Sequence, residues 1–589
     1  MILLSMNHKS LLFTLVAGLA ASVALPAPSG RAADESPAYD VVVYGGTSGG
    51  VAAAVQAARL KARVLLIEPG RQLGGLSSGG LGATDFGHPD SIGGVSREFY
   101  RRVKRHYAEP GAWKHGTLAT YRSHRHDPDS DVMFHFEPHV ADRIFRDMAR
   151  EAGVTVVLGE RLELKRGVEK AGAEIRSLTM ESGRRFRGKV FIDASYEGDV
   201  MAKAGVAYTV GREANAAFGE TKNGNQWRHM RERPRPVGHD FFRAVDPYVR
   251  PGDPSSGTIF GVPAAAAGIE GAADRSVQAY CFRLCLTDVP ENRAPFPKPA
   301  DYDPARYELL LRYLTSERRL PEWPKGPDEI EHPVLGNTLL GIPPVVIMPN
   351  RKSDSNTKGA VSFNFIGGNY DYPDGDYATR ERIFRAHVSW QLGLIWFVAH
   401  DPRVPAKYRE PMKNWGLAKD EFPETGHWPH QLYVREARRM IGEFVMRQQV
   451  CEGSERVDDP VGLGSYTMDS HNVRRYIDEH GFVRNEGTLG MPVKTPYGIS
   501  YRALTPKKAE CTNLLVPVCI SASHVVYGSM RMEPVFMVLG QSAATAAVQA
   551  IAARSSVQDV PYAALRTALL RDGQVLAVTT SKRAPVPKK

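Results

Sequence analysis

The chain has 589 residues, of which 42% are hydrophobic and 24% are charged, and its formal net charge is +10. This composition is that of a globular protein with a large core, and it excludes a collagen, a coiled coil and a chain that is disordered throughout. The basic residues are spread along the chain, with local clusters only at 101–105 and in the C-terminal tail, so we expect no nucleic-acid partner.

The first 33 residues differ from the rest of the chain. A single lysine, Lys9, precedes an apolar run at 11–25, which a proline-containing stretch at 26–31 ends. This arrangement is typical of a secretory signal peptide. A membrane anchor is the alternative, but a spanning helix needs about 20 apolar residues. The sequence therefore predicts an exported protein, periplasmic or extracellular, with no integral membrane span in the mature chain.

A dinucleotide-binding βαβ unit is predicted at 39–70. An apolar strand at 41–44 leads into a glycine turn and an alanine-rich helix, and a second strand at 63–67 ends at Glu68. The helix N-terminus would hold the pyrophosphate, and Glu68 would accept hydrogen bonds from the ribose hydroxyls. Thr47 stands where a second glycine is expected, so the pyrophosphate would shift or gain a hydroxyl contact. The predicted contacts are Gly45, Gly46, Thr47, Ser48, Gly49, Gly50, Glu68 and Pro69.

A second glycine-rich stretch at 71–81 favours FAD over NAD. A plain NAD domain does not need it, whereas a flavin ring lying across the backbone tolerates few side chains. The stretch adds Gly74, Gly75, Ser78, Gly79 and Gly80 to the predicted cofactor contacts.

Two later segments would also reach the cofactor. A buried strand at 189–194 runs into a turn at a sheet edge, which contributes Asp193, Ala194, Ser195 and Asp199. After a predicted strand at 513–520, Met532 and Glu533 begin a helix of small residues, with proline in its first turn. Its N-terminus could stabilise the negative charge of a reduced flavin. The alternative is one more core helix.

Flavin redox chemistry needs an acid or a base for the substrate proton, and we select Arg435, Glu436 and His524 as catalytic candidates. On a predicted helix, Glu436 and Arg439 would share a face, and Glu436 would polarise an arginine beside the flavin. A surface ion pair is the alternative. His524 is expected on the loop before the last long helix, either near the flavin ring or as a structural histidine.

Three further sets leave alternatives open. A group of histidines could bind a metal, although the pattern around them favours a strand followed by a helix at Pro138: His124, His126, His135 and His139. The loop at 350–356 could touch substrate or be a surface turn. Arg283 lies in an apolar segment and must have a partner, so it belongs to a structural ion pair or clamps a substrate carboxylate.

The motifs together resemble a family of exported bacterial FAD-dependent oxidoreductases. The resemblance covers nearly the whole mature chain and includes VVVYGGTSGGVAAA, LGGLSSGGLGATD, QLYVREARRMIGEFVM and ISASHVVYGSMRMEPVFMVLGQSAATAA. Members sometimes carry the label xanthan lyase, which we discount, because ordinary polysaccharide elimination needs no redox cofactor. Threonine is usual in this family at the position of Thr47. The family is similar to the succinate dehydrogenase and fumarate reductase branch, which implies an FAD domain interrupted by a substrate domain.

The predicted organisation is an α/β protein with a doubly wound Rossmann-type FAD-binding domain and an inserted cap. The segments are a signal peptide (1–33), the first part of the FAD-binding domain (38–219), a proline- and tryptophan-rich substrate or cap domain (220–429), the second part of the FAD-binding domain (430–570) and a flexible tail (571–589). No second glycine fingerprint has the context of a nicotinamide site, so the electron partner would be substrate together with an external acceptor.

Three functions remain open. The first is an exported FAD-dependent oxidoreductase that transfers hydride between FAD and a small or carbohydrate-linked organic substrate. The second is a fumarate-reductase-like flavin reductase fed by an external electron carrier. The third is a noncatalytic saccharide-binding protein on a flavoprotein scaffold.

Overall fold

The computed structural model describes residues 38–577 apart from 124–125, 232–238, 321, 323–330, 333–335 and 338–345. The predicted signal peptide, His124 and the last part of the predicted tail lie outside the described residues.

The central sheet has the strand order β3-β2-β1-β6-β5-β4, with β21 paired to β6. Its core of β3, β2, β1, β6 and β21 is parallel, and β5 and β4 add an antiparallel edge. The strands are β1 (Tyr39–Tyr44), β2 (Val64–Glu68), β3 (Thr155–Leu158), β4 (Val168–Ala171), β5 (Glu174–Thr179), β6 (Arg185–Asp193) and β21 (Leu514–Leu515). β1, β2 and the end of β6 are almost wholly buried, as a parallel sheet covered on both faces requires. The predicted α/β class with a Rossmann-type unit is confirmed.

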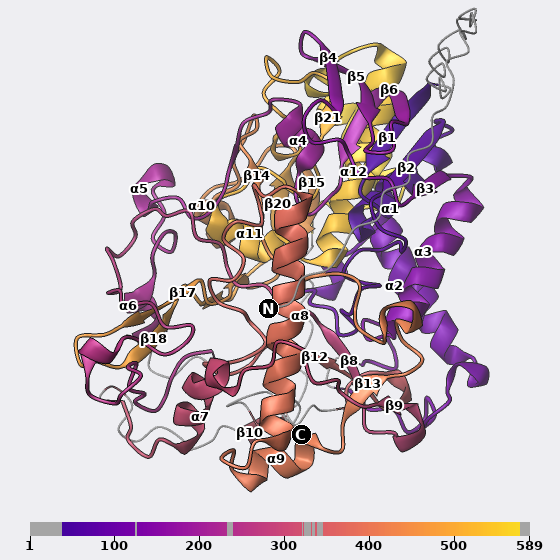
Figure 1. Ribbon diagram of the computed structural model, residues 1–589. Coiled ribbons are helices and arrows are strands. Elements are labelled where there is room, and N and C mark those ends of the chain that lie inside the picture. Colours follow the sequence, from indigo (N-terminus) through magenta and orange to yellow (C-terminus); the bar gives the residue numbers. More distant parts are fainter. Residues whose placement is uncertain are drawn as a thin grey trace, which may run out of the picture.

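A second, antiparallel sheet lies at the opposite end of the molecule, in the order β12-β8-β13-β9 (Figure 1). Its strands all come from the middle of the chain: β8 (Leu284–Thr287), β9 (Arg293–Ala294), β12 (Lys352–Ser355) and β13 (Gly416–Ala418). The other strands form two-stranded pairs: β7 (Tyr208–Thr209) with β14 (Arg439–Met440), β10 (Glu331–His332) with β11 (Gly336–Asn337), β15 (Pro460–Gly464) with β20 (Tyr497–Ser500), β16 (Met468–Ser470) with β19 (Leu489–Met491), and β17 (Arg474–Ile477) with β18 (Val483–Glu486).

Helices pack beside the central sheet, and the long helix α8 runs down the middle of the view (Figure 1). The helices are α1 (Ser48–Arg59), α2 (Gly94–Ala108), α3 (Pro138–Ala152), α4 (Asp199–Lys203), α5 (Asn215–Phe218), α6 (Trp227–Arg231), α7 (Glu308–Thr315), α8 (Tyr377–His400), α9 (Ala406–Met412), α10 (Gln448–Glu452), α11 (His524–Met530), α12 (Glu533–Ala553) and α13 (Tyr562–Arg571).

Helices α1 and α12 cross at two glycines. A Cβ atom built on Gly540 would lie 2.0 Å from the carbonyl oxygen of Gly49, and one built on Gly49 would lie 2.9 Å from that of Phe536. Small residues therefore let the two backbones touch. α12 also has the length and composition of a membrane-spanning helix, but 78% of its most apolar window is buried inside the protein. It is a core helix here.

Parts of the expected secondary structure were wrong. Residues 435–438 have no regular secondary structure and lead into β14, because Tyr433 and Met440 donate their N–H groups to Cys281 and Cys519 instead of to a helical turn. The strand expected at 513–520 is only β21, because Pro517 lacks an N–H group to donate. His524 begins the short helix α11 instead of lying in a loop.

The start of the predicted tail also needs correction. Gly573 accepts a hydrogen bond from the N–H of Gly94 at 2.8 Å, and the Gln574 side chain donates to the carbonyl oxygen of Val538 at 2.9 Å. Gln574 is 4% exposed. Residues 571–577 are therefore packed against α2 and α12 and are not a flexible tail. The inner domain boundaries at 219 and 429 stay predictions.

We predict that Gly540→Ala lowers the free energy of unfolding by about 1–3 kcal/mol, because the new methyl group would overlap the Gly49 carbonyl and push α12 away from α1. Urea denaturation of the purified protein measures this. The matched control is Gly111→Ala, where a Cβ atom would meet nothing within 4 Å. Equal stability of both variants would contradict the close crossing.

Candidate functional site

The candidate dinucleotide site lies where the carboxyl ends of β1, β2 and β6 meet the N-terminus of α1. Gly45 has a φ of 98°, and a Cβ atom there would lie 2.6 Å from the main-chain nitrogen of Ser195. Only glycine permits this turn and this close approach of the two strand ends. A cavity of about 280 Å³ opens beside it. Its lining is Gly45, Thr47, Glu68, Pro69, Gly70, Gln72, Gly75, Ser195, Tyr196, Glu197, Tyr372, Phe384, His430, Gln431 and Leu432.

Thr47 caps α1. Its hydroxyl accepts a hydrogen bond from the N–H of Gly50 at 3.1 Å and donates one to the carbonyl oxygen of Ala194 at 2.7 Å. The side chain therefore ties the helix N-terminus to the end of β6. This role explains how a threonine fits a position where a glycine was expected.

Glu68 is the last residue of β2 and lines the cavity. The two oxygens accept hydrogen bonds from the N–H groups of Gly46 and Gly70, both at 2.6 Å. Burial raises the pKa of Glu68 to about 7, although the two hydrogen bonds favour the charged form. The carboxylate is the one acidic group at the end of β2 that can accept from ribose hydroxyls, as the sequence predicts.

The second glycine-rich stretch packs tightly against the rest of the protein. Gly74 donates its N–H to the carbonyl oxygen of Gly46 at 2.7 Å, and Gly80 has a φ of 125°. A Cβ atom on Gly79 would lie 2.3 Å from that of Gln431, and one on Gly80 would lie 2.1 Å from the Arg283 carbonyl oxygen. Ser78 bonds back to the carbonyl oxygen of Gly75. A side chain at Gly79 or Gly80 would therefore overlap Gln431 or Arg283, so this packing requires glycine at both positions.

The turn after β6 divides the predicted contacts into two groups. Ser195 lines the cavity, whereas Asp193 accepts hydrogen bonds from Ser195 and from the N–H of Met201 and so holds the turn. Burial raises the pKa of Asp193 to about 6. Asp199 does not line the cavity but pairs with Arg380 at 2.6 Å and Arg438 at 2.7 Å. Tyr196 and Glu197, which sequence reasoning missed, lie between these residues and do line it.

Glu533 sits at the N-terminus of α12 inside a ring of hydroxyl groups. Its carboxylate accepts hydrogen bonds from Ser48 at 2.5 Å, Tyr196 at 2.7 Å and Ser77 at 3.4 Å. Burial raises its pKa to about 7. Met532 directly precedes the helix and is 3% exposed. Neither residue lines the cavity, so direct contact of this pair with the cofactor stays a prediction.

The three catalytic candidates are brought together, but deep in the protein. His524 Nδ1 lies 2.7 Å from Glu436, which also pairs with Arg439 at 2.7 Å and accepts from Gln278 at 2.9 Å. Burial alone would raise the pKa of Glu436, but His524 and Arg439 outweigh it and hold the pKa at about 2. Arg435 lies over the ring of Tyr433, 4.4 Å from its centre.

These residues are at most 1% exposed and line no described cavity. The expected ion pair of Glu436 with Arg439 forms, although it is buried and not on a helix. Their catalytic role stays a prediction.

Arg283 has the structural partner that its burial requires. Its guanidinium pairs with Asp354 through two hydrogen bonds, of 2.7 and 2.5 Å. Asp354 in turn accepts from the N–H of Ala83 at 2.8 Å. Both charged residues line a second cavity of about 200 Å³, which Tyr433 also lines.

His135 and His139, from the described part of the histidine group, do not share a site. His135 bonds to Ser123 at 2.6 Å, and His139 instead joins Glu137 and Glu421 in a cluster with metal-ligand spacing. The ammonium group of Lys352 lies 2.7 Å from Glu137 and 2.8 Å from Glu421. This buried ammonium group already pairs with both carboxylates that would have to bind a metal ion. The segment at 350–356, predicted as a loop, contains the buried strand β12. Asn350, which precedes this strand, is 3% exposed and bonds to Glu137 at 2.8 Å, which makes this residue structural.

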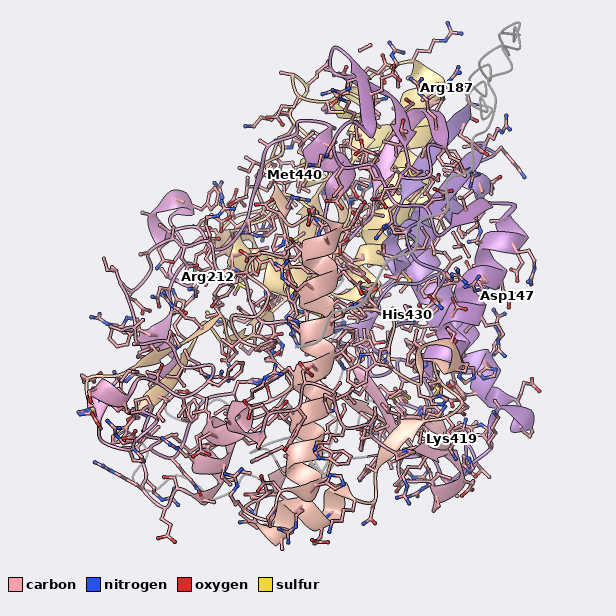
Figure 2. The ribbon with its side chains drawn as sticks, in the orientation of Figure 1. Asp147, Arg187, Arg212, Lys419, His430 and Met440 are labelled. Atoms are coloured by element: carbon pink, nitrogen blue, oxygen red, sulfur yellow. The ribbon has the colours of Figure 1, made fainter. Side chains whose placement is uncertain are left out.

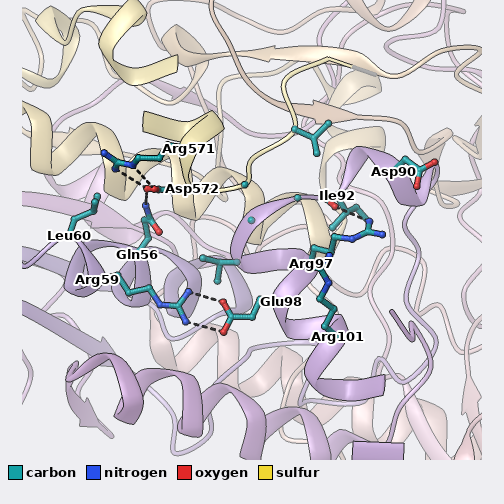
Figure 3. A pocket seen from close by; sticks show the side chains of 15 residues that line it. Gln56, Arg59, Leu60, Asp90, Ile92, Arg97, Glu98, Arg101, Arg571 and Asp572 are labelled. Atoms are coloured by element: carbon teal, nitrogen blue, oxygen red, sulfur yellow. Dashed lines mark hydrogen bonds and ion pairs between the residues drawn. The ribbon is translucent and has the colours of Figure 1, made fainter. Parts of the chain in front are cut away.

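A larger hollow of about 830 Å³ lies at the other end of α1, between α1, α2 and the residues after α13 (Figure 3). The length of α1 puts it about 18 Å from the dinucleotide cavity. Arg59 and Glu98 pair across it at 2.7 Å, and Gln56 bonds to Asp572 at 2.7 Å. These polar groups pair with one another, so we assign the hollow no chemistry.

His430 lines the dinucleotide cavity and lies beside α8 (Figure 2).

Comparisons with known proteins identify the chemistry of the site. Residues 40–569 match the model of a family described as FAD dependent oxidoreductase. No curated protein sequence matches the chain.

Solved structures with partial similarity span only part of this chain. They include OxyS anhydrotetracycline hydroxylase from Streptomyces rimosus (16% identity, 38% of this chain, TM-score 0.20) and L-amino acid deaminase from Proteus vulgaris (17% identity, 30% of this chain, TM-score 0.20). A third is NikD, an unusual amino acid oxidase (17% identity, 30% of this chain, TM-score 0.20). The matched regions span 40%, 51% and 57% of those three chains, respectively.

We predict that Thr47→Val lowers the free energy of unfolding by about 0.5–2 kcal/mol, because valine keeps the shape of threonine but cannot cap α1. Thr47→Ser keeps the hydroxyl and should stay close to the unchanged protein. Urea denaturation of the cofactor-free protein compares the two. A loss of stability in the serine variant as large as that in the valine variant would contradict the capping role.

Proposed function

The chain belongs to the family of FAD-dependent oxidoreductases, and we propose that it is an exported flavoenzyme that transfers hydride between FAD and a small or carbohydrate-linked organic substrate. The observation that carries the proposal is the cavity at the end of β1, β2 and β6, with Glu68 at one side and the N-terminus of α1 at the other.

The residues present fit the adenosine and pyrophosphate half of FAD. The first turn of α1 presents main-chain N–H groups that suit a pyrophosphate, and Glu68 offers the acceptor that ribose hydroxyls need. Gly45 and Gly75 line the cavity without a side chain that would occupy it. FAD, when bound, supplies the hydride acceptor or donor.

Tyr433, which lines the second cavity, is held by two arginines. Arg435 packs on its ring, and Arg531 donates a hydrogen bond to its hydroxyl at 2.6 Å. Glu436, the next residue after Arg435, pairs with His524 and Arg439. We therefore propose that Arg435, Glu436 and His524 position the wall between the two cavities and fix how substrate meets the cofactor.

Export and the electron partner are part of the proposal. The lysine and apolar run at 1–25 support secretion. The absence of a second nucleotide fingerprint from the sequence supports an external electron acceptor, such as oxygen, a quinone or a redox protein.

We predict that the mature protein purified with FAD shows the absorbance of bound flavin, and that one compound in an anaerobic panel of sugars, hydroxy acids and amines bleaches it. Reoxidation then separates the alternatives. Fast reaction with oxygen supports an oxidase, whereas fast reaction with an enoate acid supports the fumarate-reductase-like function. A protein that takes up no flavin, or one that binds a glycan while no compound bleaches the flavin, would overturn the proposal.

We predict that FAD affinity falls about tenfold between pH 8 and pH 6, because Glu68 with a pKa of about 7 is mostly ionised at pH 8 and mostly protonated at pH 6. Only the ionised carboxylate accepts hydrogen bonds from both ribose hydroxyls. Fluorescence titration of the cofactor-free protein measures the dissociation constant at each pH.

The control for this titration is Glu68→Gln, which cannot ionise. It should bind FAD more weakly at pH 8, and its affinity should be almost independent of pH. The same pH dependence in both proteins would show that another group is responsible.

A further inference from the structure

The second cavity, of about 200 Å³, lies next to the dinucleotide cavity and is separated from it by one short segment. Gln431 and Leu432 line the dinucleotide cavity, whereas Tyr433 lines the second one. The lining of the second cavity is Ala83, Asp85, His135, His239, Arg283, Ile347, Asp354, Asn356, Thr357, Lys358, Tyr433, Tyr466, Asp469 and His471. Ala83 and Arg283 also flank the glycine-rich stretch at 74–82, so this cavity is placed to hold a molecule against the cofactor.

Two buried polar atoms of its lining residues have no hydrogen-bond partner within the described part of the chain. They are Nη1 of Arg283 and Nδ1 of His239. Asp85 is the acid nearest to that arginine nitrogen, at 4.0 Å, which is beyond hydrogen-bond distance. Buried polar atoms are normally paired, so a bound polar molecule in this cavity is their natural partner.

The charges around the cavity balance one another. Arg283 pairs with Asp354 at 2.5 Å, and Arg531, just behind the lining, pairs with Asp469 at 2.9 Å. The other charged residues of the lining are one cation, Lys358, and one acid, Asp85. Arg435 lies near His239 but does not line the cavity. Within the lining, a ligand with a net charge would therefore meet no unmatched charge of opposite sign.

Two histidines of the cavity, His239 and His471, favour the neutral form. Burial, together with the positive charges of Lys358 and Arg435, lowers the pKa of His239 to about 3. Burial likewise lowers the pKa of His471, which contacts Thr357 and Asn364 at 3.3 Å. A neutral imidazole has one donor and one acceptor nitrogen, which suits hydroxyl groups, because each hydroxyl can also donate and accept.

We propose that this cavity is the substrate pocket and that it binds a neutral, polyhydroxylated molecule of the size of one sugar or cyclic polyol ring. The inference rests on the proposed function and adds the substrate class and the residues that recognise it. The volume corresponds to about seven water molecules at roughly 30 Å³ each, which admits a single ring and not a longer saccharide. Tyr433 and Tyr466 supply aromatic surface to such a ring. Its hydroxyl groups would bond to Asp85, His239 and Arg283.

The test is calorimetric binding to the FAD-loaded protein with cyclic compounds of similar size that differ in charge. The neutral probes are D-glucose, D-galactose, D-mannose and myo-inositol; the charged ones are D-glucuronate, D-galacturonate and D-glucosamine. We expect at least one neutral probe to bind at least tenfold more tightly than each charged one. Binding of no neutral probe, or tighter binding of a charged one, would overturn the proposal.

Two variants locate the binding. Asp85→Asn and His239→Gln should each lower the binding affinity for the best neutral probe about tenfold, because each removes one hydrogen bond in a buried site. Flavin absorbance and thermal unfolding should stay unchanged. The control is Asp90→Asn, in the remote hollow beside α2. Unchanged affinity in both cavity variants would overturn the proposed location. If the unsubstituted protein does not hold flavin, the proposed function is contradicted instead. Sugar binding to that flavin-free protein would then show that the pocket is correct although the proposed function is not.

Discussion

The contact on which the site depends is the crossing of α1 and α12 at Gly49 and Gly540. These residues are almost 500 positions apart, and their backbones touch because neither has a side chain. The contact brings the N-terminus of α12 against the N-terminus of α1, where Ser48 donates a hydrogen bond to Glu533. The last long helix of the chain thereby closes the nucleotide turn formed by its first strand and helix.

A second constraint is the set of buried ion pairs between the central sheet and the middle of the chain. Asp199, at the start of α4, pairs with Arg380 of α8 and with Arg438. Glu436 pairs with Arg439 and His524, and Arg212 pairs with Glu486 at 2.6 Å. Such pairs contribute little net stability, but breaking one leaves a buried charge, so they hold the segments in one arrangement.

Local patterns predicted the nucleotide-binding unit because its parts are neighbours in sequence. The apolar runs of β1 and β2, the glycine turn and the alanine-rich α1 each carry their own pattern, and β6 and α12 were found in the same way. The helix predicted at 435–438 was wrong because the side chains of this segment are paired with residues 88 to 239 positions away, which no periodicity shows. Thr47 looked like a defect of the motif because its partner, Ala194, is equally distant.

The sequence by itself determined the α/β class, the dinucleotide unit with Glu68 at the end of β2, and the resemblance to FAD-dependent oxidoreductases, since these depend on short-range patterns and residue types. Only the tertiary structure decided that Arg435, Glu436 and His524 are buried, that Lys352 occupies the acidic cluster, and that Asp85, His239, Arg283 and His471 line one cavity. Their placement depends on how distant segments pack, because burial and charge pairing are properties of the folded chain and not of any single stretch of it.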